Sequence, residues 1–432
     1  MNVFLYVALA LLIALFSTRV MKLIKMPNVT GYLLTGILIG PFVLGLFFNN
    51  FDFMNAGDTL SNPIAKFISD ISWISDVALG FIAFSIGGSF RLSTLKKVGS
   101  RIIVITILEA LGAAVMVFLG LLIAHFIWPT QVPFDLVLTL SAISCATAPA
   151  ATLMVIRQYQ AKGPVVSTLL PVVALDDAVA LIMFAILFAT AKSIATGSEF
   201  SLYEMLAKPL IEIVLSIVIG GVLGFVISMA CKLFKSRNNR LIWSLFSVLC
   251  ALGLYQLFRQ SFMGGFELSS LLMCMMSGAL FVNLRKDAMP TFEVIDRFTA
   301  PVFLLFFVLS GASLNLSIFA SENAPFVIII ALFYLVFRVV GKWGGAFSGA
   351  KLTKSEPAVQ KYLGFTLIPQ AGVAIGLATT AGRVLSTTTT DTVTGSVIVA
   401  VILTSTLIYE LTGPMITKIA LTKAGEITLA KA

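Results

Sequence analysis

Pro171-Val-Val-Ala-Leu-Asp-Asp-Ala-Val-Ala-Leu-Ile-Met-Phe-Ala-Ile-Leu-Phe188 is an apolar run interrupted by two adjacent carboxylates, Asp176 and Asp177. Such a run is typical of a membrane-spanning helix, and a charge near the bilayer centre costs at least ~2.5 kcal/mol. Ionisable residues that persist there usually pair with each other or mark an ion pathway. The two aspartates therefore predict an ion site inside a transmembrane helix.

The whole chain has the composition of a polytopic membrane protein. Of its 432 residues, 59% are hydrophobic and only 11% are charged, and the mean hydropathy is +1.03. Apolar stretches divided by short polar segments predict an all-α fold with thirteen transmembrane spans. We place these spans at residues 3–24, 29–48, 72–90, 100–128, 134–157, 163–192, 205–233, 240–258, 266–284, 292–315, 324–349, 357–383 and 393–421.

The basic residues predict the orientation of the chain. Most of the 29 lysines and arginines fall on alternate connections between the spans, and they form no dense stripe of the kind that binds nucleic acid. By the positive-inside rule, the N-terminus lies outside and the C-terminus lies in the cytoplasm. An odd number of spans agrees with this orientation.

Several kinds of chemistry have no sequence signal. The four cysteines lack metal-ligand spacing, and the single histidine, His125, falls at the outer end of span 4, where an interfacial role is expected. Neither a phosphate-binding glycine loop nor a nucleophile elbow is present. We therefore expect no enzyme and no cofactor, but transport driven by ion gradients, with carboxylates or a lysine handling protons.

A repeat relates the two halves of the chain. Gly87-Gly-Ser-Phe-Arg-Leu92 ends span 3, and Gly311-Ala-Ser-Leu-Asn-Leu316 ends span 10. Two spans later, prolines interrupt Ala146-Thr-Ala-Pro-Ala150 in span 5 and Ile368-Pro-Gln-Ala-Gly372 in span 12. A separation of seven spans reverses orientation, so the pattern predicts inverted repeats with discontinuous helices. Either proline alone would be explained as a simple kink.

Together these segments resemble the monovalent cation:proton antiporter superfamily, in the branch that contains bacterial sodium/proton antiporters with an Asp-Asp motif. The matching residues are Gly31–Pro41, Thr147–Pro149, Leu175–Ala178, Gly341–Lys342 and Leu367–Leu377. The resemblance implies a homodimer in the bacterial inner membrane, involved in pH homeostasis and sodium tolerance. It also implies a core transport domain, here residues 100–192 and 324–421, that moves against a dimerisation domain, here residues 1–90 and 205–315.

The resemblance assigns roles to individual residues. Asp177 matches the main cation and proton carrier, and Asp176 matches the aspartate that pairs with a lysine in the membrane, here Lys342. Two alternatives stay open. Arg338, one turn before Lys342, could be the partner of Asp176, and Lys342 could instead extend to the cytoplasmic interface.

Further ligands are expected because sodium prefers several oxygen atoms. Thr147 is the best candidate, beside the helix breaks formed by Ala148, Pro149, Pro369 and Gln370. A related branch commonly has aspartate where this chain has Ala148, so we expect water to complete the shell. Glu109 either lines the cavity or pairs with a neighbour, and Glu410 either gates the cytoplasmic side with Lys418 or makes a structural contact.

The expected activity is electrogenic exchange of two protons for one sodium or lithium ion by an elevator movement. Two titrating groups are needed, and Asp177 with the Asp176–Lys342 pair would supply them. A potassium/proton antiporter is the alternative, although its better-known members carry Gln-Asp and a cytosolic nucleotide-binding domain. A gated cation channel is more remote, since the sequence has no filter motif.

Overall fold

The computed structural model describes residues 3–23, 28–47, 52, 56–57, 62–148, 152, 155–156, 159–195, 207–234, 236–260, 268–285, 287–320, 324–388 and 392–427. These segments are helical and contain no strand, which confirms the predicted all-α class. The helices are α1 (Val3–Leu23), α2 (Asn28–Ile39), α3 (Pro63–Asp70), α4 (Trp73–Ser89), α5 (Leu92–Ile127), α6 (Phe134–Ile143), α8 (Pro164–Ala195), α9 (Lys208–Leu233), α10 (Arg237–Gln260), α11 (Ser270–Leu284), α12 (Met289–Ala312), α13 (Ala324–Leu352), α14 (Pro357–Thr366), α15 (Gly372–Thr388) and α16 (Thr392–Lys423).

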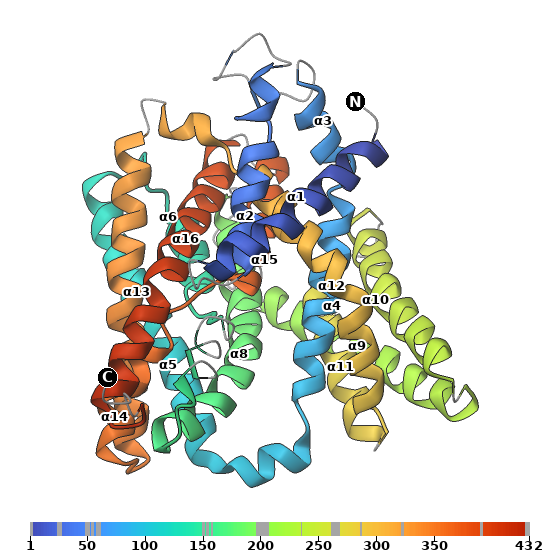
Figure 1. Ribbon diagram of the computed structural model, residues 1–432, viewed down its shortest axis with the longest axis vertical. Helices are drawn as coiled ribbons and strands as arrows, with labels where there is room; N and C mark the ends of the chain where they lie inside the picture. Colours follow the sequence, from blue (N-terminus) through green and yellow to red (C-terminus); the bar gives the residue numbers. More distant parts are fainter. Residues whose placement is uncertain are drawn as a thin grey trace.

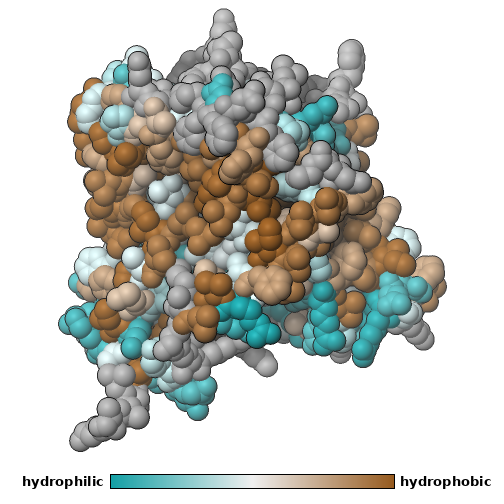
Figure 2. Space-filling view, turned by 45° about the horizontal axis from the view of Figure 1, so that its top comes forward, coloured by the Kyte–Doolittle hydropathy of each residue, from teal (hydrophilic) through white to brown (hydrophobic). Residues whose placement is uncertain are grey.

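The helices have the length and surface of a membrane bundle. Nine spans in the described segments are long and apolar enough to cross a bilayer, while Phe134–Ile143, Ser270–Leu284 and Gly372–Ser386 are apolar but shorter. Figure 2 shows brown apolar residues across the middle of the visible face and teal hydrophilic residues mainly towards its lower edge. The two ends of the chain lie at opposite ends of the bundle in Figure 1. The number thirteen stays a prediction.

The packing of helices follows the predicted repeat. Helix α4 packs against α11, and α12 packs against α2. Gly87 makes the contact between α4 and α11 possible, because a Cβ there would overlap the carbonyl oxygen of Met275. Gly311 makes the contact between α12 and α2 possible, because a Cβ there would overlap the carbonyl oxygen of Leu33. A shift of seven spans converts span 3 into span 10 and span 2 into span 9. The two glycine contacts are therefore equivalent positions of an inverted repeat.

The two interrupted spans meet in the middle of the bundle. Helix α6 ends at Ile143 and is followed by non-helical backbone at 146–148, while α14 ends at Thr366 and α15 begins only at Gly372. The backbone nitrogen of Ala148 donates to the carbonyl oxygen of Pro369 at 2.8 Å. Pro149 lies outside the described residues. The breaks leave backbone carbonyls that helical hydrogen bonds no longer satisfy.

Two segments differ from the predicted connections. Helix α5 begins at Leu92 rather than near residue 100, and it bends at Gly99, whose φ of 79° is easily adopted only by glycine. Helix α3 forms inside the predicted polar connection before span 3, because Pro63 starts it and the Asn62 side chain accepts a hydrogen bond from the Ile64 nitrogen.

Candidate functional site

Asp176 and Lys342 form a buried ion pair between α8 and α13. The Lys342 Nζ atom lies 3.2 Å from Asp176 Oδ2, and both side chains are fully buried. The same ammonium group also donates to the carbonyl oxygen of Cys145, just after α6. Because Lys342 points into the bundle, its amine does not extend to the cytoplasmic interface. The ammonium thus connects the aspartate helix with the break in span 5.

Glu109 of α5 is a second carboxylate on the same lysine. Its Oε2 atom lies 2.8 Å from Lys342 Nζ, and the Glu109 side chain is fully buried. Its Oε1 atom has no hydrogen-bond partner among the described residues. Of the two expectations for Glu109, the structure supports pairing with a neighbour. Sequence analysis could not find this contact, because Glu109 and Lys342 lie 233 positions apart in the chain (342 − 109).

Asp177 differs from its neighbour because it makes no ion pair in the part of the chain that the structure describes. Its Oδ1 atom is buried without a hydrogen-bond partner there, while the residue as a whole is half-buried. A buried carboxylate oxygen without a protein donor needs a proton, a water molecule or a cation. Asp177 is thus chemically suited to bind a cation and a proton in turn.

Arg338 does not replace Lys342 as the partner of Asp176. Its guanidinium donates to three backbone carbonyls, those of Ser144 at 2.9 Å, Ala146 at 2.7 Å and Ile368 at 2.6 Å. It also lies 4.8 Å from the ring centre of Tyr409. These carbonyls come from both interrupted spans, so Arg338 satisfies the oxygens that the breaks expose and places positive charge at two helix C-termini.

The other predicted break residues hold the crossing together. The Gln370 amide donates to the carbonyl of Ile143 at 3.0 Å and accepts from the Tyr334 hydroxyl at 3.0 Å. Thr147 is buried, and its hydroxyl donates to the carbonyl of Leu367 at 3.4 Å. No hydrogen bond in the described segments joins Thr147 to Asp177. The role of Thr147 as a cation ligand stays a prediction.

Glu410 and Lys418 are not partners in this structure. Glu410 is fully buried on α16 and accepts a hydrogen bond from the Thr30 hydroxyl of α2 at 3.2 Å. Lys418 lies over the ring of Tyr159, 4.7 Å from its centre.

His125, which was expected to have an interfacial role, hydrogen-bonds through Nδ1 to the carbonyl of Val132 at 2.7 Å.

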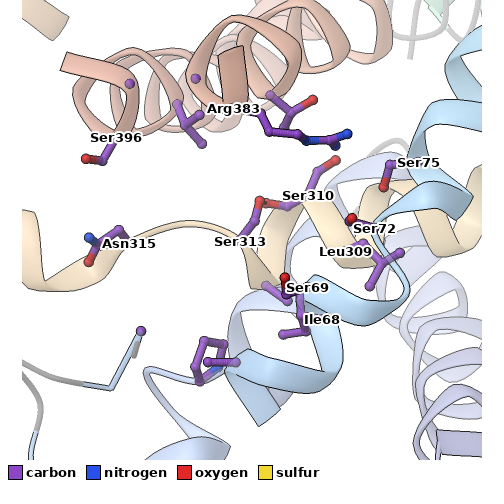
Figure 3. Close-up of a pocket in the computed structure, with 18 of the residues that line it drawn as sticks. Ile68, Ser69, Ser72, Ser75, Leu309, Ser310, Ser313, Asn315, Arg383 and Ser396 are labelled. Atoms are coloured by element: carbon purple, nitrogen blue, oxygen red, sulfur yellow. The ribbon is translucent and has the colours of Figure 1, made fainter. Parts of the chain in front are cut away.

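A cavity of about 350 Å³ lies between α3, α4 and α12 on one side and α15 and α16 on the other. Figure 3 shows Arg383 of α15 facing this cavity, with Ser310 of α12 and Ser313, just after this helix, nearby. Arg383 forms an ion pair with Asp76 of α4 at 2.7 Å. By the predicted orientation this cavity is on the outer side. Sequence analysis did not pair these two residues, because they lie 307 positions apart in the chain.

Comparison with known proteins gives one family and one fold. A family profile described as "Sodium/hydrogen exchanger, transmembrane" matches residues 7–418. The structure of the sodium proton antiporter MjNhaP1 from Methanocaldococcus jannaschii at pH 8 has a TM-score of 0.70 at 19% identity, covering 97% of this chain and 98% of that chain. An electron microscopy structure of the same antiporter has a TM-score of 0.68 at 18% identity, covering 100% of both chains. At such identities the likeness shows the fold alone. The curated proteins contain no match.

Proposed function

The chain belongs to the sodium/hydrogen exchanger family, and from this premise we propose that it is an electrogenic antiporter exchanging two protons for one sodium ion. Asp177 is the carrier carboxylate, Asp176 and Lys342 are the coupled pair, and lithium replaces sodium because both are small hard cations. The observation that carries the assignment is the contrast between the two aspartates. Asp176 pairs with Lys342 at 3.2 Å, and Asp177 has a buried oxygen without a hydrogen-bond partner among the described residues.

The chemistry follows from this contrast. Sodium binds to the free Asp177 oxygen and displaces its proton, and it then competes with Lys342 for Asp176. When Asp176 turns to the cation, the Lys342 ammonium loses a counter-ion and can release the second proton. Oxygen from Thr147 and water would complete the shell. Two protons against one sodium ion move net charge, so the membrane potential drives the exchange.

Alternating access requires the site to move between the two sides of the membrane. We propose an elevator in which residues 100–192 and 324–421 carry the site past residues 1–90 and 205–315, which form the dimer interface. The dense crossing of α6, α14, α15 and Arg338 supports a core that moves as one body. We also propose that the protein resides in a bacterial inner membrane, with its N-terminus outside.

Proteoliposomes with an imposed pH gradient test the proposal. Addition of sodium or lithium should dissipate the gradient in the parent protein, and Asp177→Asn should abolish the response. Asp176→Asn should remove the dependence of the rate on an imposed potential. Asp296→Asn is a matched control, because Asp296 is exposed near the start of α12. A response to potassium alone would replace the sodium assignment with potassium/proton antiport, and full activity of Asp177→Asn would refute the site.

A further inference from the structure

One face of α16 carries oxygen atoms that no other group satisfies within the segments that the structure describes. Thr406, Glu410 and Thr417 are fully buried, and Thr406 Oγ1, Glu410 Oε1 and Thr417 Oγ1 have no hydrogen-bond partner in the described part of the chain. Positions separated by four and seven residues lie on one side of an α-helix. The three side chains therefore form a stripe along the helix axis. Buried polar atoms without protein partners are the places where water or ions bind.

The backbone adds a further oxygen to this stripe. Pro414 lies inside α16 and has no N–H group. In a regular helix, the N–H of residue 414 would donate to the carbonyl of Glu410, four positions earlier. The Glu410 carbonyl is therefore left without its intrahelical donor, beside the carboxylate of the same residue. Carboxylate, carbonyl and hydroxyl oxygens are the ligands that hard cations prefer.

Other threonines of the same helix behave differently. Thr412 donates to the carbonyl of Ile408 at 2.8 Å, and Thr422 donates to the carbonyl of Lys418 at 2.8 Å. This backbone hydrogen bond is the ordinary way in which a helical threonine satisfies its hydroxyl. Thr406 and Thr417 do not make it, although they are more deeply buried. Thr406 and Thr417 thus place two hydroxyls without a partner in the described part of the chain on the face that carries Glu410, and Ser405 has a third on another face of α16.

The stripe leads from the C-terminal end of α16 towards the crossing. Lys418 and Lys423 mark that end as the cytoplasmic one by the positive-inside rule. Midway, Glu410 contacts Thr30 of α2, and a Cβ at Gly413 would lie 2.8 Å from Pro369 Cγ in the break of span 12. Pro369 in turn accepts the hydrogen bond from Ala148. The stripe thus lies between α2 and the break.

We propose that Thr406, Glu410 and Thr417 form a relay site for a partly hydrated alkali cation on its way between the cytoplasm and Asp177. The Glu410 carboxylate and carbonyl hold the cation. Thr417, about 10 Å along the helix axis towards the C-terminus, and Thr406, about 6 Å towards the N-terminus, replace part of its water shell before and after it occupies Glu410. The inference rests on the proposed exchange at Asp177, and it adds a second cation site that the sequence did not predict. Glu410 acts in cation access rather than as a gate paired with Lys418.

The test measures sodium-driven proton movement in oriented proteoliposomes, with sodium chloride added on one face at a time and choline chloride as the ionic control. Glu410→Gln should raise the sodium KM from the C-terminal face roughly tenfold, the order expected for one charged oxygen contact, and should leave the maximal rate and the KM from the other face near the parent values. Pro414→Ala should raise the same KM without changing any charge, because it restores the donor to the Glu410 carbonyl and only improves the helix. Thr412→Val should behave as the parent.

The outcomes separate the relay site from the proposed function. An unchanged KM in both Glu410→Gln and Pro414→Ala, or an equal rise from both faces, would overturn the relay site while the parent still exchanges sodium for protons. Failure of the proposed function would appear instead as a parent protein without sodium-driven proton movement, or as full activity of Asp177→Asn. Protein recovery and thermal unfolding of Pro414→Ala exclude misfolding as the cause of a raised KM.

Discussion

The backbone nitrogen of Ala148 donates to the carbonyl oxygen of Pro369 at 2.8 Å, and this hydrogen bond joins the two interrupted spans at their crossing. Arg338 reinforces the same junction from α13 by donating to the carbonyls of Ala146 and Ile368. Main-chain groups of two distant segments are thus fixed to each other beside the Asp176–Lys342 pair. The position of the proposed ion site depends on this junction.

Replacement of Arg338 should therefore be among the most destabilising changes in the chain. Arg338→Met leaves three buried carbonyls without donors, and each hydrogen bond to a charged group contributes about 1.5–3 kcal/mol. We expect a lower thermal unfolding midpoint in detergent and weak sodium exchange. Arg338→Lys should recover only part of the stability, because an ammonium lacks the planar fork of a guanidinium. An unchanged midpoint for Arg338→Met would contradict this role.

The Asp76–Arg383 ion pair should hold the outer cavity closed. It joins α4, in the proposed dimerisation domain, to α15, in the proposed core. Arg383→Gln should speed the reaction of a membrane-impermeant thiol reagent with Ser310→Cys, whose parent side chain lines the cavity, in a background without native cysteines. The charge-reversed pair Asp76→Arg with Arg383→Asp should slow the reaction again. Equal rates of thiol modification in all variants would contradict the role of the ion pair in closing the cavity.

Adjacent glycines of α13 offer a matched test of helix packing. A Cβ at Gly345 would overlap the carbonyl oxygen of Leu108 in α5, whereas a Cβ at Gly344 would meet nothing within 4 Å. Gly345→Ala should separate the two helices that carry Glu109 and Lys342, lowering both stability and exchange. Gly344→Ala should be neutral or stabilising by ~0.5–1 kcal/mol, since alanine favours helix. Equal unfolding midpoints of the two variants would refute the packing argument.

The carboxyl of Asp287, at the surface between α11 and α12, should make a pH-dependent contribution to the free energy of unfolding. Hydrogen bonds from Arg285 at 2.8 Å and Arg240 at 2.6 Å hold the pKa of its carboxyl below the usual value. A lowered pKa means that the stabilisation is present above the unfolded pKa and is lost as pH falls through the folded pKa. Asp287→Asn should therefore cost at most ~1 kcal/mol at neutral pH, because the carboxyl is partly exposed. Thermal unfolding of both proteins at neutral and strongly acidic pH checks this, and a difference that persists in acid would contradict it.

The repeat shows how far sequence reasoning extends. The motifs at Gly87 and Gly311 and the prolines in spans 5 and 12 predicted an inverted repeat, and the structure confirms it through equivalent helix contacts. These signals are local, since a proline removes a backbone donor wherever it lies and a glycine permits close approach. The presence of α3 was missed because the single residues Asn62 and Pro63 decide its start. The start of α5 was missed because its first nitrogen, that of Leu92, donates to the distant Asn283 side chain.

The sequence by itself determined that the chain is a helical membrane protein with two carboxylates placed where charge is costly, because hydrophobic length and local charge are properties of a single segment. Only the tertiary structure decided the partners. Lys342 rather than Arg338 pairs with Asp176, Glu109 shares that lysine, and Arg338 instead satisfies the carbonyls at the crossing. One helical turn separates the two cations, so the choice depends on which face of α13 meets α8 and which meets the breaks, and this is fixed by helix packing.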